Sequence, residues 1–241
     1  MMTRLIRKWH GRPLLPAATC VVAVLISMAT PAVAWSASTE AEATANEVCD
    51  QRSGQYQLEV EGYLGLARDG LQSETDCEVI RAMQVENDMT QRSGYADLAT
   101  YRAALFTWAK QNVNELDGCP TRSGIVVCVD MDRQLLWVQD GAEIAFGPVP
   151  ARSGSPSYPT RSGWYKLYKR EKEFWSSLYD APMPFSQFFD GGEAIHGSHR
   201  PIFEDPGSHG CVNLRYDDAR ALWSGLRIGD AVYVWGKRVG E

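Results

Sequence analysis

The sequence lacks an apolar run long enough to cross a membrane. The best candidate, from Leu14 to about Met28, contains Pro16 and is shorter than the roughly 18 uninterrupted apolar residues that a spanning helix needs. Basic residues precede this run and Ala-Val-Ala follows it at 32–34, an order typical of a secretory signal peptide. We therefore expect residues 1–34 to be removed and the protein to be exported without a stable membrane anchor. Pro16 and the shortness of the run disfavour the alternative, a retained anchor.

The chain also lacks an excess of positive charge. It carries 24 lysines and arginines against 30 aspartates and glutamates, a net charge of −6. Removal of residues 1–34 takes away four basic and no acidic residues, which leaves 20 against 30 and a net charge of −10. This balance argues against nucleic acid as a partner.

Cysteines are few, and their number is odd once residues 1–34 are removed. The five that remain are Cys49, Cys77, Cys119, Cys128 and Cys211. In an exported protein four of them can pair and one is left over. Cys49–Cys77 and Cys119–Cys128 each close a short loop in a different part of the chain, so we expect these two disulfides, although three connectivities are formally possible. Cys211 then stays free; five buried thiols without partners is the alternative, which an oxidising compartment disfavours.

The first half of the chain is predicted to be helical. Residues 35–46 are small and polar, as in a linker, and three stretches with apolar residues at helical spacing follow over 47–113. Turn signals at Asp69-Gly70 and Ser93-Gly94 separate these stretches. We expect a compact three-helix domain, whose first apolar face consists of Leu58, Val60, Tyr63, Leu64 and Leu66.

From Cys119 onward the hydrophobic period changes from helical to extended. Residues 125–130 and 134–139 are β-branched and aromatic runs, and Asp140-Gly141 is a strong hairpin turn. One short helix is expected between Asp217 and Leu226. The sequence therefore predicts an α+β chain, in which the helical domain precedes a β-rich domain over 120–236.

The tripeptide Arg-Ser-Gly occurs five times, beginning at residues 52, 92, 122, 152 and 161. The uneven spacing excludes a solenoid repeat. Serine and glycine predict a turn at each copy, whereas the sequence offers no reason for the arginines.

Three segments of the helical half resemble the peptidoglycan-binding-like three-helix domain. They are Tyr63–Ser73, Cys77–Gln84 and Gly94–Thr100, with Met83 where that family usually has phenylalanine. The resemblance implies binding to the glycan of the cell wall. A helical spacer that binds no glycan is the alternative, because apolar helix faces are needed for packing in either case.

Histidine is scarce, yet three of the four histidines lie close to Cys211 in the sequence. A cysteine becomes a nucleophile when a nearby base takes its proton. His196 can be that base, and the carbonyl of Gly197 can hold its other ring nitrogen. Gly210 allows close backbone approach, and the N–H groups of Gly210 and Cys211 can form an oxyanion hole. His209 points to the opposite face of an extended backbone from its neighbours, which favours a supporting role.

A zinc site is the alternative reading of the same segment, with His196, His199, His209 and Cys211 as four potential ligands. The motif Ser-His-Gly-Cys-Val-Asn is more typical of a specific backbone geometry around Cys211 than of a set of metal ligands. An exposed cysteine is also an uncommon ligand in an extracellular zinc site. We therefore expect no metal.

Two motifs resemble the signature of the L,D-transpeptidase catalytic-domain family, namely Ile195–Ser198 and, after a short loop, Ser208–Asn213. There are two departures: Arg161 replaces the usual proline before a Ser-Gly turn, and the spacing from His196 to Ser208 is short. Supporting matches lie at Gln134–Val138, Pro159–Gly163, Met183–Phe185 and Gly229–Val234.

The resemblance implies a sandwich-like catalytic domain over 120–236 and a cell-wall reaction. Cys211 would attack the carbonyl of the third residue of a peptidoglycan tetrapeptide stem, usually diaminopimelate, and expel the terminal D-Ala. His196 would be the general base, oriented by the Gly197 carbonyl, while His209 and the backbone of Gly210 and Cys211 would support the oxyanion. The amine of a neighbouring stem would then resolve the acyl-enzyme into a 3→3 cross-link. Carbapenem-type β-lactams would acylate the same thiol, and no cofactor is needed.

Further residues receive roles from the same resemblance. Ser208 and Asn213 would hold the active-site loop, and Met183 and Phe185 would line the pocket, although structural roles suit these four equally well. The partner would be peptidoglycan in the cell envelope, either the periplasm or the cell wall. Hydrolysis by an L,D-carboxypeptidase or endopeptidase stays open, and so does a non-catalytic wall-binding protein, although an intact cysteine–histidine pair argues against the latter.

Overall fold

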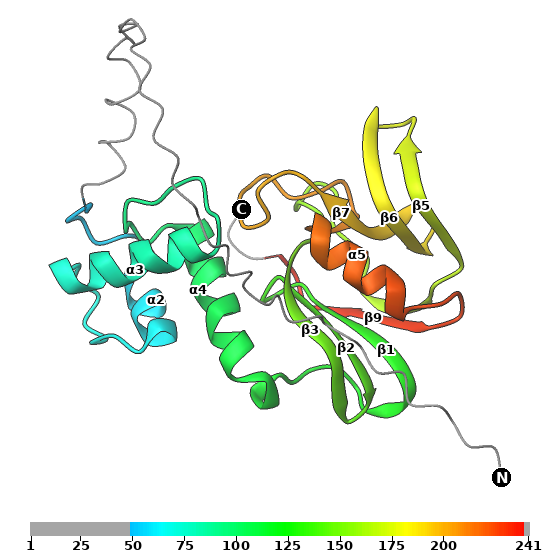
Figure 1. Cartoon of the computed structure of the whole chain (residues 1–241), viewed down its shortest axis with the longest axis horizontal. Helices are drawn as coiled ribbons and strands as arrows, with labels where there is room; N and C mark the ends of the chain where they lie inside the picture. Colours follow the sequence, from blue (N-terminus) through cyan, green and yellow to red (C-terminus); the bar gives the residue numbers. More distant parts are fainter. Residues whose placement is uncertain (1–48, 239–241) are drawn as a thin grey trace, which may run out of the picture.

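The computed structural model describes residues 49–238 and places most of its helices before the strands, as Figure 1 shows. The signal peptide and linker expected within 1–46 lie outside the described residues. No helix in the described part is both long and apolar enough to cross a membrane. The elements are α2 (Gln57–Leu64), α3 (Glu74–Glu86), α4 (Leu98–Gln111), a 3-10 turn (Val113–Glu115), β1 (Arg122–Asp130), β2 (Leu135–Gly141), β3 (Glu143–Arg152), β4 (Gly163–Lys166), β5 (Lys169–Ser176), β6 (Ala181–Asp190), β7 (Glu193–Ser198), β8 (Val212–Arg215), α5 (Tyr216–Gly225) and β9 (Ala231–Trp235).

Local sequence explains where the helices begin. Ser73 and Asp76 form a capping box at α3, and the Asp97 side chain accepts a hydrogen bond from the Thr100 N–H at the start of α4. The prediction for Leu58 is wrong, since this side chain is 42% exposed. The short helix α2 instead buries Gln57, Val60 and Glu61, which share one face at the i, i+3, i+4 spacing.

Within residues 49–238 the strands form a single curled sheet of nine, in the order β4-β9-β1-β2-β3-β8-β7-β6-β5. Its two halves face a common core, in which Val127 and Leu136 of one half join Phe185 and Ile195 of the other and Leu222 of α5. In Figure 1, α5 lies between the β1–β3 half and the β6–β7 half. The α+β class and the sandwich-like arrangement are confirmed. The predicted hairpin joins β2 to β3, and its turn lies one residue later than expected, at Gly141-Ala142, because Asp140 pairs with Glu143.

The opposite face of β1 and β2 packs against the helices. Because side chains alternate along a strand, Val126 and Trp137 point away from the core between the sheet halves and join a second core with Ile80, Leu105 and Phe106. The helices and the sheet therefore share this core. The division into domains over 47–113 and 120–236 follows the change from helix to strand, and it stays a proposal.

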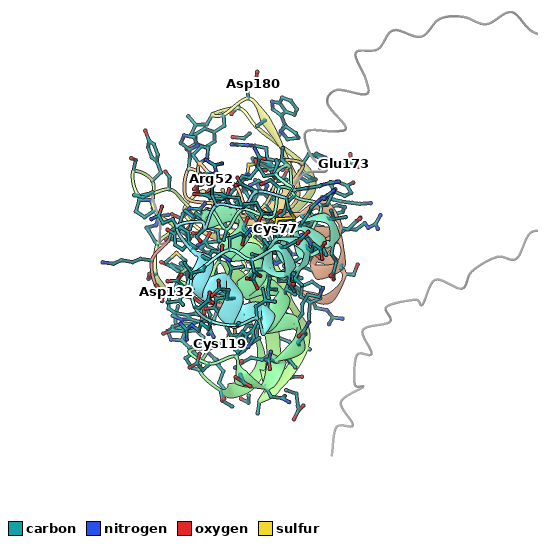
Figure 2. All side chains as sticks on the ribbon, turned by 90° about the vertical axis from the view of Figure 1, so that its left-hand side faces the viewer. Arg52, Cys77, Cys119, Asp132, Glu173 and Asp180 are labelled. Atoms are coloured by element: carbon teal, nitrogen blue, oxygen red, sulfur yellow. A yellow bond between two sulfur atoms is a disulfide. The ribbon has the colours of Figure 1, made fainter. Side chains whose placement is uncertain are left out.

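Both expected disulfides are present. Cys49–Cys77 and Cys119–Cys128 each have Cα atoms 5.8 Å apart, and Cys211 is free. Figure 2 looks onto the helical side of the molecule and labels one cysteine of each pair, Cys77 and Cys119. The pairing predicted from loop length is therefore confirmed.

The three Arg-Ser-Gly copies that begin at residues 122, 152 and 161 overlap strands and not turns, contrary to the prediction. Arg122 begins β1 and Arg152 ends β3, because their neighbours pair in the sheet. Several of these arginines make specific contacts in the structure. Arg52 and Arg161 form ion pairs with nearby aspartates, and the guanidinium of Arg122 lies 5.3 Å from the centre of the Trp164 ring. Arg152 is buried and lines the cavity described next.

Candidate active site

Cys211 and His196 line one cavity of about 270 Å³. The walls come from the ends of β3, β7 and β8, from the loop between β7 and β8, and from the β5–β6 hairpin. Figure 2 places Asp180, in the turn of that hairpin, at one extremity of the molecule. The lining consists of Arg152, Ser176, Tyr179, Ala181, Pro182, Met183, His196, Ser198, His199, Arg200, Gly207, Ser208, His209, Cys211 and Asn213.

The register of the sheet brings together the polar side chains that line the cavity. His196 on β7 is paired with Asn213 on β8, and Asn213 is paired in turn with Arg152 on β3. These three residues therefore form a row across adjacent strands. Cys211 lies two positions before Asn213, so the alternation of side chains places it on the same face. Histidine and cysteine, fifteen positions apart in the sequence, thus line the same cavity because β7 and β8 are parallel neighbours.

The His196 side chain is buried and has one defined partner. Its Nδ1 lies 2.8 Å from the carbonyl oxygen of Gly197, and a carbonyl only accepts, so Nδ1 carries the proton and Nε2 has a lone pair. Burial is the main cause that lowers the pKa of His196 to about 4; the charge of Arg152 acts in the same direction and the bond to Gly197 opposes it. The imidazole is therefore neutral at pH 7 and able to accept a proton.

Cys211 is also neutral at rest. Burial raises the pKa of its thiol to about 11, the charge of Glu193 adds to this, and a backbone hydrogen bond at Ala194 opposes it. The thiol packs against an apolar cluster that contains Met183 and Phe188. A protonated thiol that shares a cavity with a neutral imidazole needs proton transfer before it can act as a nucleophile.

The loop before the thiol is held by side-chain hydrogen bonds. Ser208 Oγ donates to the Cys211 carbonyl and accepts from the Gly210 N–H at 3.1 Å, and Thr160 Oγ1 donates to the Gly210 carbonyl at 2.8 Å. Gly210 has φ +107, and a Cβ there would lie 3.2 Å from Glu193 Oε1, so glycine is required. The Gly210 N–H is engaged by Ser208, so its use in an oxyanion hole needs that bond to open.

Arg161, which replaces the proline expected at its position, binds the carboxylates beside this loop. Its backbone N–H donates to Glu193 Oε2 at 3.2 Å, and its Nε donates to Asp190 Oδ2 at 2.6 Å. Burial raises the pKa of Glu193, which lies next to the thiol, while Arg161 opposes that shift. The departure from the family pattern therefore supplies a counter-charge for Glu193.

The other two histidines stack on tyrosines. The His209 ring lies 4.7 Å from the centre of Tyr179 and 4.8 Å from that of Tyr158, and the His199 ring lies 5.0 Å from Tyr216. Within residues 49–238, no three histidine, cysteine or acidic side chains are placed to share a metal ion. The structure therefore does not assemble the four zinc ligands that the sequence offered.

The remaining predicted residues divide into two groups. Met183, Ser208 and Asn213 line the cavity, but Phe185 does not. Phe185 has a left-handed backbone, φ +58, so it does not continue the strand alternation from Met183, and its ring packs in the core against Tyr216 and Trp223. The prediction that Phe185 lines the pocket is corrected accordingly.

The sequence patterns did not indicate four residues that lie at or near the site, namely Arg152, Tyr158, Tyr179 and Glu193. The tyrosines lie in irregular segments without periodicity. The repeated Arg-Ser-Gly tripeptide was the sequence feature that could have drawn attention to Arg152. Its burial depends on the pairing of β3 with β8, which the sequence does not reveal.

Comparison with known proteins assigns the fold and the family. A model described as YkuD, the L,D-transpeptidase catalytic domain, matches residues 124–234. The structure of an L,D-transpeptidase (Yku) from Stackebrandtia nassauensis is 33% identical, with 80% of this chain and 96% of that chain covered and a TM-score of 0.61. An L,D-transpeptidase from Xylanimonas cellulosilytica is 23% identical, covering 78% and 98%, with a TM-score of 0.47. One from Mycobacterium smegmatis is 22% identical, covering 47% and 59%, with a TM-score of 0.44.

A search of curated proteins finds no match. The identity and coverage shared with the Stackebrandtia nassauensis protein, together with the catalytic-domain match, are sufficient for assignment. The chain belongs to the YkuD family and is a peptidoglycan-modifying L,D-transpeptidase.

Proposed function

We propose that this L,D-transpeptidase is exported to the cell envelope and forms 3→3 cross-links through an acyl-enzyme on Cys211. The observation that carries the proposal is the cavity shared by Cys211 and His196, in which Gly197 fixes the imidazole tautomer. Two disulfides support an oxidising location. The helical unit is proposed to bind glycan on its sequence resemblance alone.

The acylation step begins with a neutral pair. His196 Nε2 takes the thiol proton while Cys211 Sγ forms a bond to the carbonyl carbon of the third stem residue. The amide bond to D-Ala then breaks, and the imidazolium returns its proton to the leaving amine. The product is a thioester on Cys211 and free D-Ala.

Resolution of the thioester reverses these roles. The side-chain amine of a neighbouring stem attacks the thioester carbonyl and gives its proton to His196, after which the C–S bond breaks and the thiol is restored. We propose that the Cys211 backbone N–H stabilises the oxyanion in both steps. His209, held between two tyrosines, is proposed to position the loop, and Gly210 contributes its N–H once Ser208 releases it.

Products of a disaccharide-tetrapeptide substrate test this function. We expect the mature protein to release D-Ala and to form a dimer with a 3→3 linkage, detected by mass spectrometry after chromatography. Release of D-Ala with tripeptide as the sole product would replace cross-linking by the hydrolytic alternative. Absence of D-Ala release would contradict both and leave a wall-binding role.

Because Cys211 and His196 are both neutral at rest, the rate of acylation should depend on pH in an unusual way. The base form of His196 exists above its pKa of about 4, so acylation should stay constant from pH 7 down to about pH 5, where an ordinary histidine with a pKa of about 6.5 is protonated. The thiolate forms only as the pH approaches about 11. Alkylation by iodoacetamide should therefore keep rising beyond pH 9; a midpoint below about 8.5, the value of an unperturbed thiol, would contradict the neutral pair.

A further inference from the structure

Arg152 is a buried cation that has no carboxylate partner among residues 49–238. Its side chain is 1% exposed and forms no ion pair there. Burial, followed by repulsion from Arg200 and Arg238, lowers its pKa to about 10, while the charges of Asp205 and Glu204 oppose the shift, so it stays charged at pH 7. Burial of a charge is unfavourable unless a group of opposite charge contacts it, and a ligand carboxylate would supply such a contact.

The hydrogen bonds of Arg152 are incomplete. A guanidinium has five N–H donors, and Arg152 donates from Nη1 to the Pro201 carbonyl at 2.8 Å and from Nη2 to Ser198 Oγ at 3.4 Å. Its Nε is buried without a partner, and so is Oδ1 of Asn213, the residue paired with it on β8. An unused donor and an unused acceptor thus belong to two cross-strand partners that line the active-site cavity.

The cavity wall carries two arginines although the protein as a whole is acidic. Its lining includes Arg152 and Arg200 but no aspartate or glutamate, and the nearby Glu193 pairs with Arg161. Arg200 is exposed at the rim and acts on the charge of Arg152. Such a wall attracts anions and repels cations.

We propose that Arg152 and Arg200 form a subsite for a carboxylate of the donor stem peptide, with Asn213 Oδ1 accepting a peptide N–H. This inference rests on the proposed function of Cys211. It adds that the enzyme selects donors by their negative charge. Arg152 and Arg200 act as binding groups, and neither takes part in the transfer of the acyl group.

Strand geometry places the proposed subsite about one substrate residue away from the carbonyl that Cys211 attacks. Neighbouring strands lie about 4.8 Å apart and a strand rises about 3.3 Å per residue. Arg152 is one strand away from Asn213, which is two residues beyond Cys211. A carboxylate adjacent to the attacked carbonyl can therefore reach the guanidinium. The tetrapeptide offers two sources: the terminal carboxylate of D-Ala and the side-chain carboxylate of diaminopimelate.

Amide analogues of the substrate distinguish these sources without any mutation. We compare the tetrapeptide with one amidated at D-Ala and one amidated at the diaminopimelate side chain, measuring kcat/KM for D-Ala or D-alaninamide release. Loss of a charged hydrogen bond should reduce kcat/KM by about 10- to 100-fold for one amide, and that amide identifies the carboxylate. If both amides react within twofold of the acid, the subsite does not exist, while D-Ala release still upholds the proposed function.

Variants separate a binding role from a merely structural one. Arg152→Gln should abolish the preference for acid over amide, whereas Arg152→Lys should keep part of it because the charge remains but the planar fork is lost. Arg200→Gln should weaken the preference and, being exposed, tests the subsite if Arg152→Gln does not fold. Arg220→Gln is the matched control, since Arg220 is exposed on α5 and pairs with Asp217; it should keep the preference.

A role limited to holding the loop through Pro201 and Ser198 makes a different prediction. In that case Arg152→Gln lowers kcat/KM for acid and amide by the same factor, and Arg200→Gln leaves their ratio unchanged. This pair of results would overturn the proposed subsite. D-Ala release by the unmodified enzyme, measured in the same series, shows separately whether the proposed function holds.

Discussion

Cys211→Ser should abolish acyl-enzyme formation with tetrapeptide and with carbapenem-type β-lactams. The thiol is the proposed attacking atom, and a serine hydroxyl is far less acidic and less nucleophilic, so a neutral imidazole cannot activate it comparably. Adducts are measured on the intact protein by mass spectrometry, and D-Ala release is measured in parallel. We expect neither above background.

The interpretation of this variant needs two controls. Its unfolding temperature should match that of the unmodified protein, since both disulfides lie elsewhere. Chelators should leave the activity of the unmodified enzyme unchanged. Full activity in Cys211→Ser, or activity lost to chelation and restored by zinc, would reject the thiol mechanism in favour of a metal site.

His196→Ala should slow acylation by about 10²- to 10⁴-fold, the range for loss of a general base. The thiol has a pKa of about 11, so without His196 very little thiolate exists at pH 7. The rate is measured as the single-turnover burst of D-Ala. Raising the pH should restore part of the activity of the variant, because hydroxide then forms the thiolate directly.

His199→Ala is the matched histidine variant. His199 is exposed and stacks on Tyr216, so its loss should slow acylation by less than tenfold. Equal losses in the two histidine variants, or a loss below tenfold in His196→Ala, would remove His196 from the role of base.

The sequence was most informative where function depends on local backbone. The contact of His196 with the Gly197 carbonyl joins consecutive residues, and the disulfides close short loops, so the structure agrees with the sequence on these features. The glycine at position 210 likewise follows from a positive φ.

The sequence did not predict the features that depend on pairing between strands distant in the chain. The burial of Arg152 and its place in a row with Asn213 and His196 require the β3–β8–β7 register, to which no local pattern corresponds. Phe185 was misplaced because a single left-handed residue interrupts the alternation of β6. The Gly210 N–H, expected to be free for an oxyanion, is engaged by Ser208, a bond set by the loop rather than by the motif.

Peptide mapping of the trapped acyl-enzyme tests the central claim most directly. The mature protein is mixed with tetrapeptide in the absence of an acceptor, quenched in acid within the burst, digested and analysed by mass spectrometry. We predict a mass increase equal to the tetrapeptide minus free D-Ala, located on the peptide that contains Cys211 and removed by hydroxylamine. An adduct on any other residue, or D-Ala release during the burst while the peptide containing Cys211 remains unmodified, would contradict the account.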